Sequence, residues 1–312
     1  MAISRPTVAQ LRAFLALAEH LHFGDAAAAL RMSQPALSGA VSALEENLET
    51  RLVERTTRKV LLTPAGEHVA RRAEVVLAEL DRLVDEVKAV RGPLVGPLRV
   101  GVIPTVAPYL LPIVLPRLAK EHPDLELSVH EDQTEHLVAE LLAGRLDVVL
   151  LALPLLAAGV TEIVLYEEDF VLVAPAGSEL GDDGIEREAL HDMDVLLLNK
   201  GHCLRDQALD VCRDVGARTA AATYATSLAT LVQLVSGGLG VTLVPETALP
   251  VETRRAPNLG LHRFAPPAPF RRIGLGFRST CPRVDEFEAL AESVRMAVAE
   301  SGVAPGIRPA RP

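Results

Sequence analysis

The first third of the chain alternates short apolar helical patterns with turn residues. A first helix begins at the capping box of Thr7 and Gln10, and a short second helix is predicted over residues 24–31. Ser33 caps a third helix and Pro35 stands in its first turn, where the missing N–H is harmless. Small and polar side chains face away from the apolar stripe of that helix. The pattern predicts a helix-turn-helix whose third helix enters the DNA major groove.

Two short apolar strands over residues 52–62 flank a basic tip. Such a tip alone is most often an ordinary solvated turn. Beside a helix-turn-helix, however, it is typical of a wing that contacts phosphates. The candidate DNA-binding residues on the third helix and the wing are Ser33, Gln34, Pro35, Ser38, Ser42, Arg55, Thr57, Arg58 and Lys59.

A long helix is predicted from Pro64 to about Val90, with Thr63 as its cap. Its apolar residues alternate steps of four and three, which is a heptad seam. Such a seam can pack on its own domain, but three heptads with no adjoining domain favour a second copy of the chain. Residues 91–97, rich in Gly and Pro, end the helix and form a hinge. The seam consists of Val69, Ala73, Val76, Leu80, Leu83, Val87 and Val90.

From residue 98 the pattern alternates strand and helix. Continuous Val and Leu runs bounded by helices favour parallel strands that are covered on both faces. We therefore expect several domains: a winged helix-turn-helix (1–63), a linker helix (64–90), a hinge (91–97), an α/β regulatory domain (98–301) and a disordered tail (302–312). Strands are predicted over 98–103, 125–131, 146–153, 163–166, 170–174, 194–199, 241–244 and 273–277, and helices over 108–121, 134–143 and 282–300.

Composition and charge narrow the classes of protein. The chain has 312 residues, of which 49% are hydrophobic and 23% charged, as in ordinary globular proteins. A net charge of −10 argues against non-specific coating of nucleic acid, and the absence of Trp disfavours stacking on single strands. The longest apolar run, residues 148–160, is too short to span a membrane. Without a secretory pattern at the amino terminus, we expect a cytoplasmic protein, where structural disulfides are uncommon.

Two of the three cysteines, Cys203 and Cys212, lie close together in the sequence. His202 and Arg205 place positive charge near Cys203, which favours a reactive thiolate. Nine positions along a helix separate two residues by about 13 Å and roughly half a turn, whereas a disulfide needs Cα atoms within about 7 Å. From Arg205 onward the apolar spacing predicts a helix. If residues 203–214 form one helix, a bond between the two cysteines requires that helix to unwind. From spacing alone, the commoner interpretation is that Cys203 is an incidental thiol and Cys212 a buried apolar residue.

The amino-terminal motifs resemble the winged helix-turn-helix of LysR-type transcriptional regulators. Glu49 departs from the pattern, because the family commonly has Gly at the end of the third helix, and we expect a less tight turn there. The resemblance rests on Ala26-Ala27-Ala28-Ala29-Leu30, Ser33-Gln34-Pro35-Ala36-Leu37-Ser38, Leu44-Glu45, Leu52, Glu54-Arg55 and Leu62-Thr63-Pro64-Ala65-Gly66.

Motifs of the regulatory region are similar to the branch of this family that senses hydrogen peroxide. They are Ile103-Pro104-Thr105-Val106, Pro108-Tyr109-Leu110-Leu111-Pro112, Gln133-Thr134, Gly201-His202-Cys203-Leu204-Arg205-Asp206-Gln207-Ala208, Cys212, Ala225-Thr226-Ser227-Leu228 and Arg271-Arg272. The resemblance implies a fold like periplasmic binding proteins, with subdomain I at about 98–167 and 269–301 and subdomain II at about 168–268.

The same resemblance implies chemistry and partners. Cys203 would be the peroxidatic cysteine and Cys212 the resolving one, and disulfide formation would switch the regulatory domain. The implied peroxide pocket consists of Thr105, Thr134, His202, Asp206 and Arg272. Expected partners are double-stranded promoter DNA, hydrogen peroxide, one or three further copies of the chain, and RNA polymerase. We expect no cofactor, no metal, no membrane contact and no enzymatic role.

Three alternatives remain open at this stage. A regulator of the same family could bind a small organic anion, with Cys203 incidental. A thiol peroxidase would leave residues 1–90 without a purpose, and a DNA-organising protein is disfavoured by the acidic balance. Without the resemblance, the two threonines would be helix caps, His202 a loop residue and Arg272 a surface charge. The sequence also leaves open whether Cys212, Cys281 or an external thiol resolves Cys203.

Overall fold

The computed structural model describes residues 5–55, 60–89, 93–178, 180, 183–256, 258–302 and 307–309. The chain divides into two compact units, with the boundary after Val87. Within the described residues, no helix combines the length and the apolar character needed to cross a membrane.

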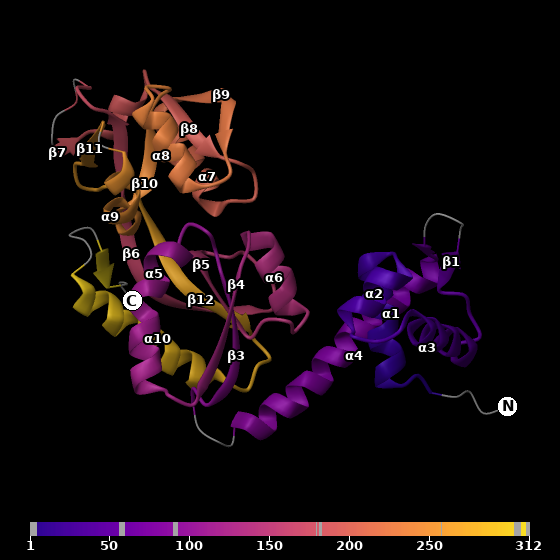
Figure 1. The fold of residues 1–312 in the computed structure, drawn as a ribbon. Helices are drawn as coiled ribbons and strands as arrows, with labels where there is room; N and C mark the ends of the chain where they lie inside the picture. Colours follow the sequence, from indigo (N-terminus) through magenta and orange to yellow (C-terminus); the bar gives the residue numbers. More distant parts are fainter. Residues whose placement is uncertain are drawn as a thin grey trace. The chain divides into compact units, whose positions relative to one another are not determined.

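The first unit is the predicted winged helix-turn-helix (Figure 1). The capping box is confirmed, because Thr7 and Gln10 exchange hydrogen bonds, and the Ser33 hydroxyl accepts from the N–H of Ala36. The apolar stripe of the third helix packs against Phe14 and Leu17. The wing tip, residues 56–59, lies outside the described residues. The elements are α1 (Val8–His20), α2 (Phe23–Ala29), α3 (Gln34–Asn47), β1 (Val53–Arg55), β2 (Val60–Leu62), which pairs antiparallel with β1, and α4 (Pro64–Ala89).

The turn after α3 is closed, contrary to the expectation of a less tight turn. Glu49 adopts the left-handed conformation (φ 49°), and the N–H of Thr50 donates to the Glu45 carbonyl oxygen at 3.0 Å. This backbone conformation costs a residue other than Gly roughly 1 kcal/mol. Glu49 thus adopts, at an exposed position, a conformation that glycine would adopt more easily, and the Thr50 hydrogen bond closes the turn.

The buried carboxylate of Glu45 joins α3 to the wing, a role that the sequence pattern did not reveal. Its Oε1 accepts hydrogen bonds from the N–H groups of Leu52 (2.7 Å) and Val53 (3.2 Å). Leu52 immediately precedes strand β1, and Val53 is the first residue of that strand. Glu45 thus fixes the point at which the wing leaves the helical core.

Replacing Glu45 with alanine should loosen the wing, because two N–H groups at a buried position lose their acceptor, at about 1–3 kcal/mol for each unsatisfied group. Hydrogen exchange of the full chain would show faster exchange at Leu52 and Val53. Glu46→Ala, at the exposed neighbouring position, is the matched control. Equal protection of Leu52 and Val53 in the two variants would contradict this role.

The second unit is a mixed α/β domain with two hydrophobic clusters, which define its two subdomains (Figure 1). In subdomain I, β3 is parallel to β4 and β5, as predicted, whereas β12 is antiparallel to β5 and β6. Helices α5 and α10 pack together on one face of this sheet, and α6 covers the other. Its elements are β3 (Gly96–Val102), α5 (Ala107–Glu121), β4 (Leu125–Glu131), α6 (Thr134–Leu142), β5 (Val148–Leu153), β12 (Phe270–Arg278) and α10 (Val284–Ser301).

Subdomain II contains strands and helices that the sequence pattern partly missed. Strands β7, β9 and β11 and helix α8 were not predicted, because their residues are short runs or mix apolar with polar positions. The elements are β7 (Asp183–Ile185), β8 (Asp194–Leu198), α7 (Cys203–Val215), β9 (Arg218–Ala225), α8 (Leu228–Ser236), β10 (Thr242–Pro245), the 3₁₀ turn η2 (Glu246–Ala248), α9 (Leu249–Glu252) and β11 (Leu259–Phe264).

One strand, β6 (Val160–Pro175), replaces the two strands predicted over 163–166 and 170–174. The acidic run Glu167–Asp169 interrupts the apolar pattern and suggested a break. In the structure each of its carboxylates pairs with an arginine, so the strand continues through it. Strands β6 and β12 both run from subdomain I into subdomain II (Figure 1).

The carboxyl-terminal segment corrects another prediction. Residues 302–312 were expected to be disordered, yet Ile307–Pro309 form strand β13, antiparallel to β6 at Tyr166–Glu168. Arg308 donates to the Asp169 carboxylate at 2.6 Å. The tail therefore binds along the edge of β6, and this ion pair stabilises it there.

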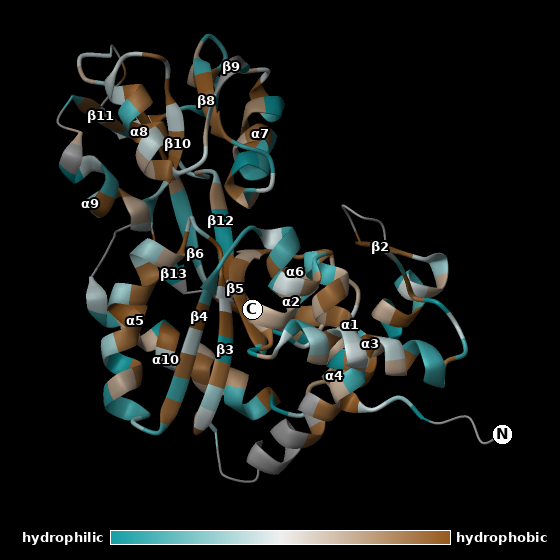
Figure 2. Ribbon diagram, turned by 45° about the vertical axis from the view of Figure 1, so that its right-hand side comes forward, coloured by the Kyte–Doolittle hydropathy of each residue, from teal (hydrophilic) through white to brown (hydrophobic). Residues whose placement is uncertain are grey.

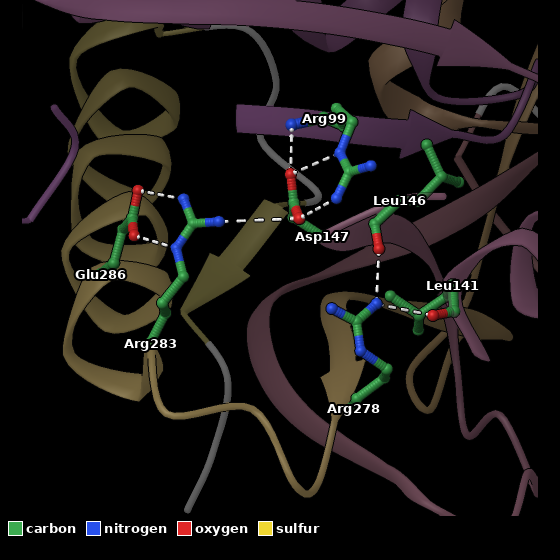
Figure 3. Close-up of polar contacts among 7 residues, drawn as sticks. All are labelled: Arg99, Leu141, Leu146, Asp147, Arg278, Arg283 and Glu286. Carbon is green, nitrogen blue, oxygen red and sulfur yellow. Dashed lines mark hydrogen bonds and ion pairs between the residues drawn. The ribbon is translucent and has the colours of Figure 1, made fainter. Parts of the chain in front are cut away.

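A buried charge network fastens the base of subdomain I (Figure 3). Asp147 accepts hydrogen bonds from the backbone N–H of Arg99 (2.8 Å) and from its Nε (3.1 Å) and Nη2 (2.8 Å), and Arg283 lies 3.6 Å away. Arg283 also pairs with Glu286 on α10. Arg278, at the end of β12, donates to the carbonyl oxygens of Leu141 and Leu146, both at 2.6 Å. Asp147 therefore links β3 to the start of α10, and Arg278 separately links the end of β12 to the end of α6 and to the residues before β5.

Candidate functional site

Cys203 and Cys212 lie on one continuous helix, α7, and both are free thiols, as is Cys281. Nine helical positions correspond to about 13 Å along the axis, well beyond the roughly 7 Å between Cα atoms that a disulfide allows. The prediction that a bond between them requires unwinding is therefore consistent with the observed helix.

The two cysteines belong to different hydrophobic clusters. Cys203 is half-buried and packs against the cluster of subdomain I, whereas Cys212 is 2% exposed within the cluster of subdomain II. Burial raises the pKa of the Cys212 thiol to about 11, so this thiol is protonated at neutral pH. Cys281 is buried in the subdomain I cluster. Cys203 therefore faces subdomain I, whereas Cys212 is held in subdomain II.

Three buried polar atoms at the starts of α6 and α7 lack hydrogen-bond partners within the described parts of the chain. They are Thr134 Oγ1, His202 Nδ1 and Gln207 Oε1. His202 is the residue preceding α7, and burial lowers its pKa, so its imidazole is neutral at pH 7. This corrects the expectation that His202 places positive charge near Cys203. Gln207 follows Cys203 by one helical turn and lies on the same face of α7. Gln207 belongs to a motif of the sequence, but residue type and spacing alone did not indicate a role for it.

The starts of α6 and α7 meet at Gly201. This residue has φ 96°, and a Cβ there would overlap the side-chain amide of Gln133, which precedes Thr134. Only glycine combines that backbone conformation with such a close approach. The loop before Cys203, in subdomain II, is therefore in direct contact with the start of α6, in subdomain I.

The arginine beside Thr105 is Arg271 rather than the predicted Arg272. Arg271 Nη1 donates to Thr105 Oγ1 at 3.1 Å, and Nη2 donates to the Thr105 carbonyl oxygen at 3.0 Å. Arg272 instead pairs with Glu167 at 2.8 Å, and half of its side chain is exposed. Successive residues of a strand point to opposite faces, so the two adjacent arginines of β12 have separate partners.

The remaining predicted pocket residues are placed as follows. Thr105 is buried in the loop after β3, and Thr134 begins the helix after β4, the parallel neighbour of β3. Both stand at the carboxyl edge of the parallel strands, where ligands bind in open α/β sheets. Asp206 is exposed on the first turn of α7. Arg205 donates to the Leu198 carbonyl oxygen at 2.9 Å and lies over the Tyr224 ring.

The candidate DNA-binding face is partly described. Gln34 and Pro35 are exposed at the start of α3, and Ser38 and Ser42 are half-buried farther along it. The Ser33 hydroxyl caps the helix. Arg55 ends β1, with its side chain outside the described set, and Thr57, Arg58 and Lys59 lie outside the described residues altogether.

Helix α4 buries only the beginning of its predicted seam. Ala73 is buried against its own domain, whereas Val76, Leu80 and Leu83 are exposed, Leu83 by 62%. The side chains of Val87 and Val90 lie outside the described set. Figure 2 shows hydrophobic positions along the described part of this helix. The exposed positions are available to a partner helix.

Comparison with known proteins places both units. The family model of the bacterial regulatory helix-turn-helix protein, lysR family, matches residues 8–67, and that of the LysR substrate binding domain matches residues 91–299. A probable hydrogen peroxide-inducible genes activator from Streptomyces viridosporus is 59% identical over 296 residues, covering 94% of this chain and 95% of the relative.

Solved structures agree over nearly the whole chain. Peroxide-bound OxyR of Corynebacterium glutamicum, in a cysteine-to-serine variant, is 46% identical with a TM-score of 0.67, covering 96% of this chain and 94% of that one. A full-length cysteine-to-aspartate variant of Pseudomonas aeruginosa OxyR is 34% identical with a TM-score of 0.76, covering 99% and 100%. The chain therefore belongs to the LysR family of transcriptional regulators and, within it, to the OxyR branch.

Proposed function

We propose that this DNA-binding regulator senses hydrogen peroxide through oxidation of Cys203, with Cys212 as the resolving cysteine. The observation that carries the proposal is the set of unpartnered buried polar atoms, Thr134 Oγ1 and His202 Nδ1, at the meeting point of the helix that begins with Cys203 and the start of α6. Buried polar groups normally have partners. A small molecule that both donates and accepts hydrogen bonds would satisfy them, and peroxide has this character.

The chemistry balances in two steps. The Cys203 thiolate attacks one peroxide oxygen, the O–O bond breaks, and the other oxygen leaves as hydroxide, which takes up a proton to form water; Cys203 becomes a sulfenic acid. The Cys212 thiol then attacks the sulfenic sulfur, forming the disulfide and releasing a second water. Thr105, Thr134 and His202 would bind and orient the peroxide, with Arg271 in place of Arg272 at Thr105, and Asp206 would hold a water near the first turn of α7.

The output of the switch follows from the two clusters. Forming the disulfide removes Cys203 from the subdomain I cluster or Cys212 from that of subdomain II, and it breaks the helix between them. The new packing of residues 199–214 would change how regulatory domains associate, as in switches between two discrete packings. Hydrogen exchange over this segment should differ between reduced and oxidised protein.

Counting thiols tests the proposal directly. Peroxide should remove two of the three free thiols, and mass spectrometry should find a Cys203–Cys212 disulfide. Three remaining thiols would sink the proposal in favour of a small organic effector, and a bond to Cys281 would reassign the resolving residue. Rapid multiple turnover of peroxide with a reductant would point instead to a peroxidase.

The exposed part of α4 supports dimerisation, which places two third helices on a paired half-site. Gln34, Pro35, Ser38 and Ser42 would face the major groove, and Arg55, Thr57, Arg58 and Lys59 would contact phosphates. Assembly into a tetramer and contact with RNA polymerase rest on the resemblance alone.

Replacing exposed Leu83 with lysine should weaken the dimer, because it places a charge at the proposed helix seam. Sedimentation should show more monomer, and affinity for a paired half-site should fall more than affinity for a single one. Val75→Lys, at an exposed position of the same helix outside the seam, adds the same charge and is the control. An unchanged oligomeric state in Leu83→Lys would exclude this seam.

A further inference from the structure

Four polar groups from four separate segments form one buried chain of hydrogen bonds. Thr247 stands in η2 of subdomain II, Glu168 on β6, Arg271 on β12, and Thr105 in the loop after β3 of subdomain I. The side chains of Glu168 and Arg271 are both 0% exposed. Such buried charges need fully satisfied partners, because an unpaired one is very costly in a low-dielectric interior.

Both buried charges have hydrogen-bond partners. Glu168 Oε2 accepts from the backbone N–H of Thr247 (3.1 Å) and from its hydroxyl (2.6 Å). Glu168 Oε1 accepts from Arg271 Nε (2.8 Å) and Nη2 (2.7 Å). Arg271 then donates to the hydroxyl and the carbonyl oxygen of Thr105. Each member is therefore oriented by the one before it.

The direction of these bonds determines what the Thr105 hydroxyl can do. A guanidinium has only donors, so Thr105 Oγ1 must accept from Arg271 Nη1. The single proton of the hydroxyl is then left to donate to another acceptor. Thr105 is thereby prepared as a donor to an oxygen atom, which is the role needed at a leaving peroxide oxygen.

This chain of hydrogen bonds also connects the two subdomains. Thr105 belongs to subdomain I and Thr247 to subdomain II, while Glu168 and Arg271 lie where β6 and β12 pass between them (Figure 1). A change in the relative position of the subdomains would break the chain at one of its links. The orientation of Thr105 is thus a property of the reduced arrangement that the structure shows.

We infer that Glu168 and Thr247 are positioning residues of the peroxide site, which act through Arg271 on Thr105. This inference rests on the proposed function, because it assigns Thr105 as a donor to peroxide. It adds that fast oxidation of Cys203 requires the reduced arrangement of both subdomains, even though Thr247 lies in a segment distant in sequence from the pocket residues.

Thr247→Val is the decisive variant, because it keeps the side-chain volume and removes one donor to Glu168. The rate constant for Cys203 oxidation by peroxide should fall about tenfold, as expected for the loss of one hydrogen bond to a buried charged group. Alkylation of Cys203 by iodoacetamide, which needs no donor to a leaving oxygen, should change by less than roughly twofold. Thr247→Ser should restore the peroxide rate.

Thr242→Val is the matched control. Thr242 is another buried threonine of subdomain II, whose hydroxyl donates to the Leu196 carbonyl oxygen at 2.9 Å outside the chain of bonds. Its variant should retain the wild-type peroxide rate. If Thr247→Val fails to fold, Glu168→Gln, which keeps the side-chain shape, takes its place in the same two assays.

The outcomes separate this inference from the proposed function. Equal peroxide rates in Thr247→Val and Thr242→Val, or equal slowing of oxidation and alkylation, would overturn the inference. Thr105→Val distinguishes the two levels: if it slows oxidation while Thr247→Val does not, only the positioning role is wrong. If Thr105→Val leaves the rate unchanged, the donor role of Thr105 is wrong and the positioning role falls with it.

Discussion

Cys203→Ser is expected to lower the rate of thiol oxidation by hydrogen peroxide by at least about a hundredfold, because the two remaining thiols are buried and oxidation requires an accessible thiol. Cys212 has a pKa of about 11 through desolvation, and Cys281 lies in the subdomain I cluster. Cys212 lies nine residues after Cys203 on α7, and Cys281 follows strand β12. The rate of oxidation can be measured by counting free thiols at successive times after rapid mixing with peroxide and quenching.

Two further cysteine variants complete this experiment. Cys281→Ser should behave as the wild type, because its position is outside α7. Cys212→Ser should oxidise at the wild-type rate but stop at the sulfenic acid, which a dimedone adduct at Cys203 would reveal. Rapid oxidation that survives in Cys203→Ser would show that another cysteine is the sensor.

Asp147→Ala is expected to destabilise the regulatory unit by about 1–3 kcal/mol. The substitution removes the buried carboxylate that accepts hydrogen bonds from Arg99, whereas Arg283 keeps its pairing with Glu286. Asp147 is 2% exposed and is in contact with both Arg99 and Arg283 (Figure 3). Loss of the acceptor for the Arg99 backbone N–H adds to the effect. Urea unfolding of the full chain, followed by circular dichroism, would show an earlier transition for this unit.

Glu140→Ala provides the contrast. Glu140 pairs with Arg145 in the same subdomain, but 52% of the arginine side chain and 33% of the glutamate side chain are exposed. A solvent-exposed pair contributes no more than about 1 kcal/mol. If the two variants unfolded at the same urea concentration, the network around Asp147 would not be the anchor that its burial indicates.

The proposed peroxide site shows which features residue order can predict and which it cannot. The motif containing His202 and Cys203 and the motif containing Thr134 were found from sequence, because residue type and order within one segment carry them. The arginine that contacts Thr105 is Arg271 and not Arg272, a difference that residue order does not reveal, because adjacent strand residues differ only in the face to which they point. The pairing of β12 with β5 and β6 decides which face of the strand meets Thr105. Residues next to Arg271 in the sequence do not encode this pairing.

Contacts between distant segments also explain why β6 is one strand and not the two that the sequence pattern predicts. Its acidic run reads as a break, since charges in a buried strand are unfavourable without partners. Those partners, Arg271, Arg272 and Arg308, come from segments more than 100 residues away in the chain. The tail strand β13 was missed for the same reason, because three residues have a strand conformation only when an open edge is available.

By itself the sequence determined the helix-turn-helix, the long helix after it, the α/β character of the rest and the positions of the two cysteines on α7. These features depend on local periodicity, capping and spacing, which act between residues close in the chain. Only the tertiary structure decided that Cys203 and Cys212 belong to different clusters, that Gly201 meets Gln133, and that Glu168 and Arg271 join Thr105 to Thr247. Those contacts bring together segments distant in sequence, and only the packing of the whole regulatory unit creates them.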